Sequence, residues 1–352
     1  MNIKDYGWNE YFEQEFKKID KSAVIAGRVI ADFGQLVRVI TANGEVTVNR
    51  PVHKTDDGMQ IAVGDWLVLE PSFSEELAVN SVLPRKTKFS RAAAGLEVKE
   101  QIVAANADTV FIIQSLNKDF NMRRLERYVI AAWESGAVPV VVMTKADCCS
   151  DIAEKLAIVH ETAVGIEVYA ISAYTGEGLD NIRKYFTNGK TVALLGSSGV
   201  GKSTLVNTLA EKELLKTQSI REDDSRGRHT TTHRELILLP QGGLILDTPG
   251  MRTLSLWDSD TGMDIMFGDI EELVSHCRFH DCKHQNEPGC SVREALESGE
   301  LDKKRWESWL KLQKEIAHME ARKEGKLRAN EKQWGRQISK FQKELAKERF
   351  FR

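Results

Sequence analysis

The feature that most constrains this chain is a glycine-rich run at residues 196–204, with the sequence GSSGVGKST. It matches the phosphate-binding pattern G-x-x-x-x-G-K-[ST] at Gly196, Gly201, Lys202 and Ser203. A short apolar stretch that we expect to be a buried strand precedes the run, and an expected helix follows it. A strand, a glycine turn and a helix N-terminus direct successive backbone N–H groups at an anion. The sequence therefore predicts a site for the phosphates of a nucleotide.

The residues of this run have separate expected roles. Glycines are needed because a Cβ would block the tight turn and keep the backbone away from the phosphates. Lys202 is expected to reach the β- and γ-phosphates, and the Ser203 hydroxyl to ligate Mg²⁺. The expected nucleotide-binding residues of the run are Gly196, Ser197, Ser198, Gly199, Val200, Gly201, Lys202, Ser203 and Thr204.

Between residues 107 and 251, apolar strands alternate with helical stretches, which predicts a mainly parallel sheet covered by helices. The expected strands are residues 108–114, 138–143, 168–171, 192–195 and 244–246. The expected helices are residues 123–135, 151–164 and 179–186. This pattern is typical of an α/β nucleotide-binding domain.

Two short motifs follow expected strands, at the edge where α/β folds bind their ligands. The sequence TKAD, from Thr144 to Asp147, matches the T/N-K-x-D guanine-reading pattern. The Asp147 carboxylate can accept from the ring N–H and the exocyclic amine of guanine, a pair of donors that adenine lacks. We expect Lys145 to cover the base and Thr144, in place of the commoner Asn, to tether this loop to the phosphate loop. Ser172 and Ala173 follow the next strand, and we expect the Ala173 N–H to meet the base carbonyl.

The remaining expected chemistry flanks the last strand. Asp247, in the sequence DTPG, is expected to hold Mg²⁺ through water, and the Gly250 N–H to face the γ-phosphate. Upstream, Thr231 in the polar sequence GRHTTT is expected to close on Mg²⁺ and the γ-phosphate. Many GTPases orient the attacking water with a Gln at the position that Met251 occupies here, and a Met side chain cannot do this. His229 is our candidate for that role, and a solvent-facing loop His is the equally favoured alternative.

A cysteine–histidine cluster follows in the sequence CRFHDCKHQNEPGC. Three thiolates and one imidazole suit a closed tetrahedral structural Zn²⁺ site, although the spacing C-x4-C-x-H-x5-C differs from the common zinc fingers. His280 is a competing candidate within the same loop. The expected metal ligands are Cys277, Cys282, His284 and Cys290.

Residues 22–91 are rich in short β-stretches separated by turn signals such as Asn43-Gly44. Five short strands, at residues 24–30, 36–41, 45–49, 66–69 and 78–83, predict a small closed barrel of the OB or a related type. Such a barrel either contacts RNA or serves as a packing module, and its scattered basic residues leave both interpretations open. We expect residues 85–95 to be a basic linker. Before the barrel, aromatic residues at helical spacing predict a short amphipathic helix within residues 1–20.

Composition limits the setting of the protein. At 352 residues the chain is long enough for two or three domains, and it has no apolar run of membrane-spanning length and no signal-peptide pattern. Five cysteines, an odd number, do not suggest a disulfide framework, so we expect a cytoplasmic protein with Cys148 and Cys149 as reduced structural thiols. Residues 303–352 contain 16 Lys+Arg and 7 Asp+Glu. This basic tail favours either a polyanionic partner or a solvated helix with interleaved ion pairs.

The order of the motifs is unusual. In ordinary GTPases the phosphate loop comes first and the base-reading loops last, whereas here TKAD and SA precede GSSGVGKST and DTPG comes at the end. The domain therefore looks circularly permuted, with residues 187–190 closing the old termini. This order, joined to the cysteine–histidine cluster, resembles the RsgA (YjeQ/YloQ) family of GTPases that depend on the small ribosomal subunit. The resemblance covers residues from about 22 to about 304.

The resemblance implies a fold and a function. The implied fold is an α/β circularly permuted P-loop GTPase domain at residues 92–255, an OB-like β-barrel at 22–91 after an extension at 1–21, and a zinc-binding helical domain with a basic tail at 256–352. The implied activity is hydrolysis of GTP to GDP, stimulated by the small ribosomal subunit during its late maturation. GTP or GDP, Mg²⁺ and one structural Zn²⁺ are the implied cofactors, and the small subunit with its rRNA is the implied partner of a monomer that contacts no membrane. The alternative is a nucleotide-regulated RNA-binding scaffold with little turnover.

Overall fold

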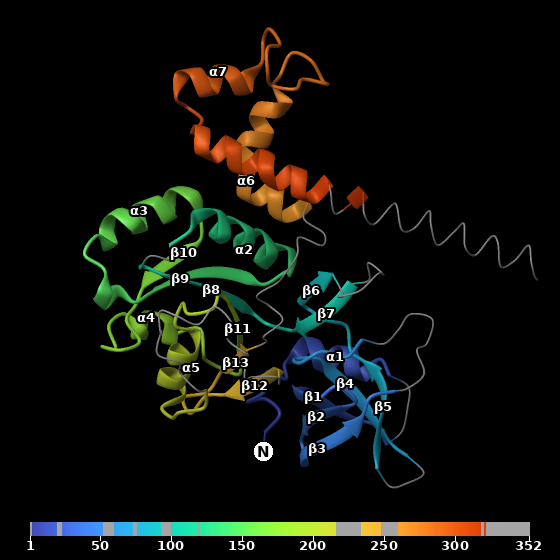
Figure 1. Cartoon of the computed structure of the whole chain (residues 1–352). Coiled ribbons are helices and arrows are strands. Elements are labelled where there is room, and N and C mark those ends of the chain that lie inside the picture. Colours follow the sequence, from blue (N-terminus) through green and yellow to red (C-terminus); the bar gives the residue numbers. More distant parts are fainter. Residues whose placement is uncertain are drawn as a thin grey trace, which may run out of the picture. The chain divides into compact units, whose positions relative to one another are not determined.

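The computed structural model of the chain describes residues 2–19, 23–51, 60–72, 76–92, 100–117, 120–215, 234–247, 260–317 and 320–321 (Figure 1). The chain divides into two compact units. The first comprises Met1–Arg91 and Gln101–Met266, and the second Ala92–Glu100 and Phe267–Arg352. The first unit contains the phosphate loop and the second contains the cysteine–histidine cluster.

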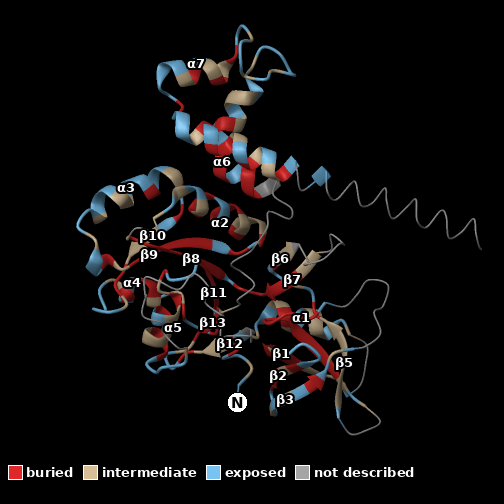
Figure 2. Cartoon of the chain, in the orientation of Figure 1, coloured by how far each residue is buried: buried red, intermediate tan, exposed pale blue. Residues whose placement is uncertain are grey.

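Five parallel strands form the centre of the first unit, in the order β10–β9–β8–β11–β13. All residues of β8 and β11 are buried, as expected for strands that are covered on both faces (Figure 2). The five strands expected between residues 107 and 251 are thereby confirmed. Their bounds are β8 (Thr109–Ser115), β9 (Val138–Thr144), β10 (Glu167–Ala170), β11 (Thr191–Leu195) and β13 (Leu244–Asp247).

Helices cover both faces of these strands (Figure 1). The helices α4 (Leu179–Arg183) and α5 (Lys202–Ala210) pack on one face, where Ile182 and Leu205 share a core with Phe111 of β8. On the other face lie α2 (Met122–Glu134) and α3 (Ile152–Thr162). The helices predicted by sequence periodicity are therefore present, with ends that differ by a few residues.

The N-terminal strands extend the same sheet to eleven strands. They pair antiparallel in the order β3–β2–β1–β4–β5, and β1 also pairs with β12, at Ala31↔Glu235. The five predicted strands are confirmed, but no ladder between β3 and β5 occurs among the described residues, so a closed OB-like barrel is not confirmed. The bounds are β1 (Ile25–Asp32), β2 (Leu36–Thr41), β3 (Gly44–Asn49), β4 (Trp66–Pro71), β5 (Leu77–Val82) and β12 (Arg234–Leu238).

The segment expected to be a basic linker is partly a strand. Residues of β6 (Lys88–Ala92) pair with β7 (Glu100–Ala105) in a separate two-stranded sheet. The linker prediction was therefore wrong for residues 88–92. The basic composition of residues 85–95 does not show this strand, because its pairing partner β7 begins only at Glu100.

The N-terminal helix α1 (Glu10–Lys17) packs on the antiparallel strands through aromatic rings. Phe12 is buried, and its ring centroid lies 5.7 Å from that of Trp66. Trp8 precedes the helix and meets the same Trp66 ring edge-on at 4.7 Å. The predicted amphipathic helix is thus confirmed, and its apolar face covers the strands instead of facing solvent.

A buried arginine joins three segments of the first unit. Arg28 on β1 is 2% exposed, and its guanidinium donates to the carbonyl oxygens of Tyr6 at 2.5 Å, Gly64 at 3.2 Å and Asn106 at 2.8 Å. Burial lowers the pKa of Arg28 to about 10, so the side chain stays charged at neutral pH. One cation therefore holds together the N-terminal segment, the residues just before β4 and the residues just before β8.

The second unit is helical around a small apolar core. Helix α6 (Asp260–Ser275) contains one non-helical residue, the buried Phe267, at φ −124° and ψ 27°. Arg305 donates to both carboxylate oxygens of Asp269, at 2.9 and 2.8 Å, and its guanidinium lies 5.0 Å from the Phe267 ring. Helix α7 (Ser291–Ser298) follows the cysteine–histidine loop. In the parts of the chain that the structure describes, no helix is long and apolar enough to cross a membrane.

Two glycines provide a matched test of the junction between the antiparallel and parallel strands. Both Gly64 and Gly34 have left-handed backbones, with φ of +93° and +88°. A Cβ on Gly64 would lie 2.0 Å from the Ala105 carbonyl oxygen, whereas a Cβ on Gly34 would meet nothing within 4 Å. We expect Gly64→Ala to lower the free energy of unfolding by about 1–3 kcal/mol more than Gly34→Ala, since only the former adds a clash to the backbone strain. Chemical denaturation measures the difference, and equal losses would contradict the packing described here.

Candidate nucleotide site and cysteine–histidine cluster

The phosphate loop connects the buried strand β11 to α5. A Cβ on Gly196 would lie 2.5 Å from the carbonyl oxygen of Ile113 on β8, so the backbone passes too close for another residue. Gly199 and Gly201 have left-handed φ values of 80° and 95°, and Gly201 is the N-cap of α5. The glycines expected from the motif are therefore required by a close approach and by backbone conformation.

Lys202 begins α5 and is 8% exposed. Its ammonium donates to the carbonyl oxygen of Gly196 at 2.6 Å and to that of Ser197. The charge therefore lies within the loop, where a phosphate-loop lysine meets phosphate. Ser203 follows in the first turn of α5, while Ser198 and Thr204 are exposed.

The base-reading loop is hydrogen-bonded to the phosphate loop. The Thr144 hydroxyl at the end of β9 donates to the carbonyl oxygen of Val200 at 2.5 Å, so the tether expected from the sequence is present. Lys145 adopts a left-handed φ of 62°, and its ammonium donates to the carbonyl oxygen of Gly199 at 2.8 Å. The sequence did not predict this second bond, because it depends on where the two loops meet.

The expected guanine reader, Asp147, lies in the 3₁₀ turn Ala146–Cys148 and is exposed. The Ser172 hydroxyl, followed by the Cys148 thiol, lowers the pKa of Asp147 below its ordinary value. The Cys148 sulfur lies 3.1 Å from a carboxylate oxygen of Asp147. Asp147 is therefore an ionised acceptor at neutral pH, as recognition of two N–H donors requires. Sequence reasoning gave Cys148 only a structural role and missed its contact with this carboxylate.

The second base-reading loop lies beside the first, because β10 and β9 are parallel neighbours. The N–H of Ala146 donates to the carbonyl oxygen of Ile171 at 3.1 Å, and Ser172 is fully buried. Thr208 of α5 donates to the carbonyl oxygen of Ala173 at 3.2 Å. The TKAD loop therefore contacts the strand end before the SA loop, and the SA loop contacts α5. All three lie at the same edge of the sheet.

The last predicted part of the site lies at the end of β13 and outside the described residues. Asp247 ends β13, which is the parallel neighbour of β11, so its half-buried side chain belongs to the same edge of the sheet as the phosphate loop. His229, Thr231 and Gly250 lie outside the described residues, as does Met251.

One polar side chain at the phosphate loop was missed by the sequence analysis. Arg124 in the first turn of α2 donates from Nη1 to the Ser197 hydroxyl oxygen at 2.7 Å. The sequence placed this residue on a helix after the strand β8 but assigned it no role. The signal available was its position at the start of a helix that follows the carboxyl end of a parallel strand.

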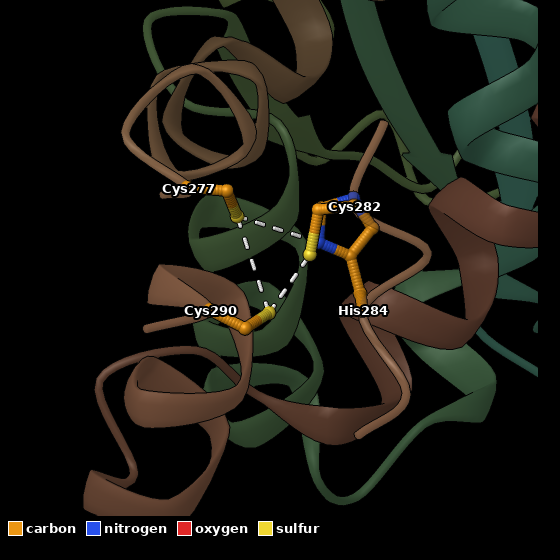
Figure 3. A group of neighbouring side chains, drawn as sticks. All are labelled: Cys277, Cys282, His284 and Cys290. Carbon is orange, nitrogen blue, oxygen red and sulfur yellow. Dashed lines mark hydrogen bonds between the residues drawn. The ribbon is translucent and has the colours of Figure 1, made fainter. Parts of the chain in front are cut away.

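In the second unit, the four predicted metal ligands come together (Figure 3). The donor atoms of Cys277, Cys282, His284 and Cys290 all lie within 4.8 Å of one another. Nδ1 of His284 is 3.5 Å from the sulfurs of Cys277 and Cys290, which are 4.0 Å apart. Tetrahedral Zn–S bonds of about 2.3 Å would separate two sulfurs by about 3.8 Å, so the group fits one such ion. His280 is exposed and is not part of the group.

The fold and the order of its loops define a class: a P-loop protein in which the TKAD and SA loops precede the phosphate loop in the chain. The family model described as RsgA GTPase matches residues 82–257. "Small ribosomal subunit biogenesis GTPase RsgA 2" of Lactiplantibacillus plantarum is 43% identical over 322 residues, which cover 90% of each chain. RsgA 1 of Oceanobacillus iheyensis is 49% identical over 285 residues, covering 80% of this chain and 81% of the relative. The chain belongs to the RsgA GTPase family, as the motif order predicted.

Solved structures agree with the permuted fold. The crystal structure of YjeQ from Thermotoga maritima aligns with a TM-score of 0.60 at 25% identity, covering 82% of this chain and 97% of that chain. YloQ, described as a circularly permuted GTPase, aligns with a TM-score of 0.60 at 23% identity, covering 85% and 97%. The circular permutation inferred from the motif order is therefore confirmed, and GTP hydrolysis is the activity that the family shares.

The bond between Thr144 and Val200 can be tested by removing only the hydroxyl. We expect Thr144→Val to weaken binding of guanine nucleotides about five- to tenfold, because about 1 kcal/mol of loop-to-loop hydrogen bonding is lost. Thr144→Ser keeps the donor and is expected to bind like the original chain. Titration with a fluorescent GDP analogue measures both variants. Equal affinities for all three proteins would show that the bond does not support the site.

Proposed function

We propose that this chain binds the small ribosomal subunit and couples GTP hydrolysis to late maturation of that subunit. The observation that carries the proposal is that the loop with the ionised Asp147 is hydrogen-bonded directly to the phosphate loop. The bonds are made by Thr144 and Lys145. This observation is joined to 43% and 49% identity with relatives named small ribosomal subunit biogenesis GTPases. The chain is inferred to work in the cytoplasm as a monomer, with rRNA among its contacts.

Each site residue has a proposed role. Lys202 binds the β- and γ-phosphates within the loop, with the loop residues 196–204 supplying backbone N–H groups. Ser203 would ligate Mg²⁺ directly and Asp247 through water; the ion, when bound, offsets phosphate charge. Thr231 and Gly250 are proposed to contact the γ-phosphate, while Asp147 and the Ala173 N–H read guanine. Clustering of the phosphate loop, both base-reading loops and Asp247 at one edge of the sheet supports these assignments.

We also propose the domain layout that the sequence predicted. Residues 22–91 would form the OB-like barrel, which needs one further ladder, since β3 and β5 are the two ends of the order β3–β2–β1–β4–β5. Residues 92–255 would be the GTPase domain. Residues 256–352 would be a domain that folds around one Zn²⁺ and continues into the basic tail.

The choice of nucleotide tests the central part of the proposal. Purified protein should hydrolyse GTP but not ATP, and small ribosomal subunits should stimulate that turnover. Asp147→Asn should weaken GTP binding at least about tenfold, because an amide cannot accept from both guanine donors. Glu177→Gln changes an exposed carboxylate in the loop that follows Ser172 and Ala173, and is the matched control. If the chain binds GTP but hydrolyses it slowly, at a rate that small subunits do not change, the alternative of a nucleotide-regulated RNA-binding scaffold is favoured.

His229 is proposed to orient the attacking water, since Met251 occupies the usual position of the Gln. His229→Ala should lower subunit-stimulated turnover at least about tenfold and leave the affinity for GTP unchanged, because the residue would act only after binding. Single-turnover kinetics with saturating small subunits measure the rate. A rate equal to that of the original chain would remove His229 from the mechanism.

The proposed Zn²⁺ is tested by metal content and stability. The chain should purify with about one Zn²⁺, and Cys290→Ser should lose it, because Cys290 supplies one of the four donors that the structure groups together. The second unit has a small core, so loss of the ion should also lower its melting temperature. Cys149→Ser, at a thiol distant in sequence from the cluster, should retain the ion. A chain that contains no metal when isolated under reducing conditions would contradict the assignment.

A further inference from the structure

Arg124 reaches the phosphate loop from an element that the nucleotide motifs do not include. Its Nη1 lies 2.7 Å from the Ser197 hydroxyl oxygen, although the two residues are 73 positions apart in the chain. The Arg124 backbone N–H donates at 3.1 Å to the side chain of Asn121, the N-cap of α2. The guanidinium is therefore carried by a capped helix end and is half-buried, which limits the positions that it can adopt.

Ser197 is contacted by a second cation. The Lys202 ammonium donates to the Ser197 carbonyl oxygen, while Arg124 donates to its hydroxyl oxygen. Two positive charges from α2 and α5 thus converge on one residue of the loop that binds phosphate. The guanidinium is permanently charged and forms strong hydrogen bonds with anions, so both cations would attract a triphosphate bound at this loop.

Different positions of the phosphate loop are bonded to different elements. Here the first half means Gly196–Ser198 and the second half Gly199–Gly201. Thr144 and Lys145 of the base-reading loop bond to Val200 and Gly199, in the second half. Arg124 of α2 bonds to Ser197, in the first half. A loop that is already held in one conformation loses less entropy when it binds its ligand.

We propose that Arg124 is a positioning residue of the nucleotide site: through Ser197 it fixes the first half of the phosphate loop against α2, and its charge favours GTP over GDP. This inference rests on the proposed function, because it takes a guanine nucleotide as the ligand. Its two parts make different predictions, since the bond requires the Ser197 hydroxyl and the charge does not.

Removing the guanidinium should weaken binding of GTP. Arg124→Ala is expected to raise the Kd for GTP about tenfold and the Kd for GDP less, because the triphosphate carries more negative charge. Arg124→Lys retains the charge and should recover most of the preference for GTP over GDP. Arg123→Ala is the matched control, since this neighbouring arginine is exposed on the same helical turn, and it should bind both nucleotides like the original chain.

A double-mutant cycle separates the bond from general packing. Ser197→Ala should raise the Kd for GTP about threefold to tenfold, and the double variant Arg124→Ala/Ser197→Ala should bind no worse than Arg124→Ala. Isothermal titration with GTP and GDP gives the four affinities without requiring turnover. Thermal unfolding of each variant shows whether it is folded.

Several results would overturn the proposal. Fully additive losses in the cycle would show that Arg124 and Ser197 act independently, and an unchanged Kd in Arg124→Ala would show that neither role exists. If Arg124→Ala does not fold, Ser197→Ala decides the question, because it leaves α2 intact and unaltered GTP affinity would contradict the bond. A chain that binds GTP as described but does not respond to ribosomal subunits would refute the proposed function and leave this inference supported.

Discussion

The cation of Arg28 is the constraint on which the assembly of the first unit depends. A buried guanidinium is tolerable only when its donors are satisfied, and here carbonyl oxygens of Tyr6, Gly64 and Asn106 accept them. These acceptors belong to the N-terminal segment, the approach to β4 and the approach to β8. Because β1 carries Arg28 and also pairs with β12, the antiparallel strands are bonded to the parallel sheet both by a ladder and by a buried charge. The β-rich region is therefore integrated with the sheet that carries the nucleotide site.

The nucleotide site follows from parallel strands whose carboxyl ends share one edge. A predicted site residue lies at or just after the carboxyl end of each of the strands β9, β10, β11 and β13. Residues as far apart in the chain as 144 and 247 therefore lie at the same edge of the sheet. Hydrogen bonds then join the collected loops: Thr144 to Val200, Lys145 to Gly199 and Arg124 to Ser197. The phosphate loop is consequently bonded to the elements on both sides of it. Circular permutation preserves this arrangement, because the site depends on strand adjacency and not on the order of the chain.

The second unit presents a different stability problem. Its apolar core is small, and the loop between α6 and α7 holds three thiols and an imidazole within 4.8 Å of one another. Four such groups brought together without a shared ligand gain little, whereas a tetrahedral ion would cross-link the loop and contribute directly to folding. The boundary between the two units falls within α6, at the non-helical residue Phe267.

Much of this protein could be read from its sequence. Most strands and helices, the phosphate loop, the Thr144 tether and the grouping of three cysteines with His284 follow from local patterns, since backbone periodicity and short motifs involve neighbouring residues. The permuted order follows from the sequence of these motifs along the chain. The strand β6 was taken for a linker, and nothing in the sequence indicated β7, β12 or the pairing of β1 with β12, because each depends on partners distant in the chain. The barrel closure stays a prediction. The contacts of Arg124 with Ser197 and of Lys145 with Gly199 join residues 73 and 54 positions apart. Such contacts exist only once packing has brought the elements together, and no local pattern of residue types encodes them.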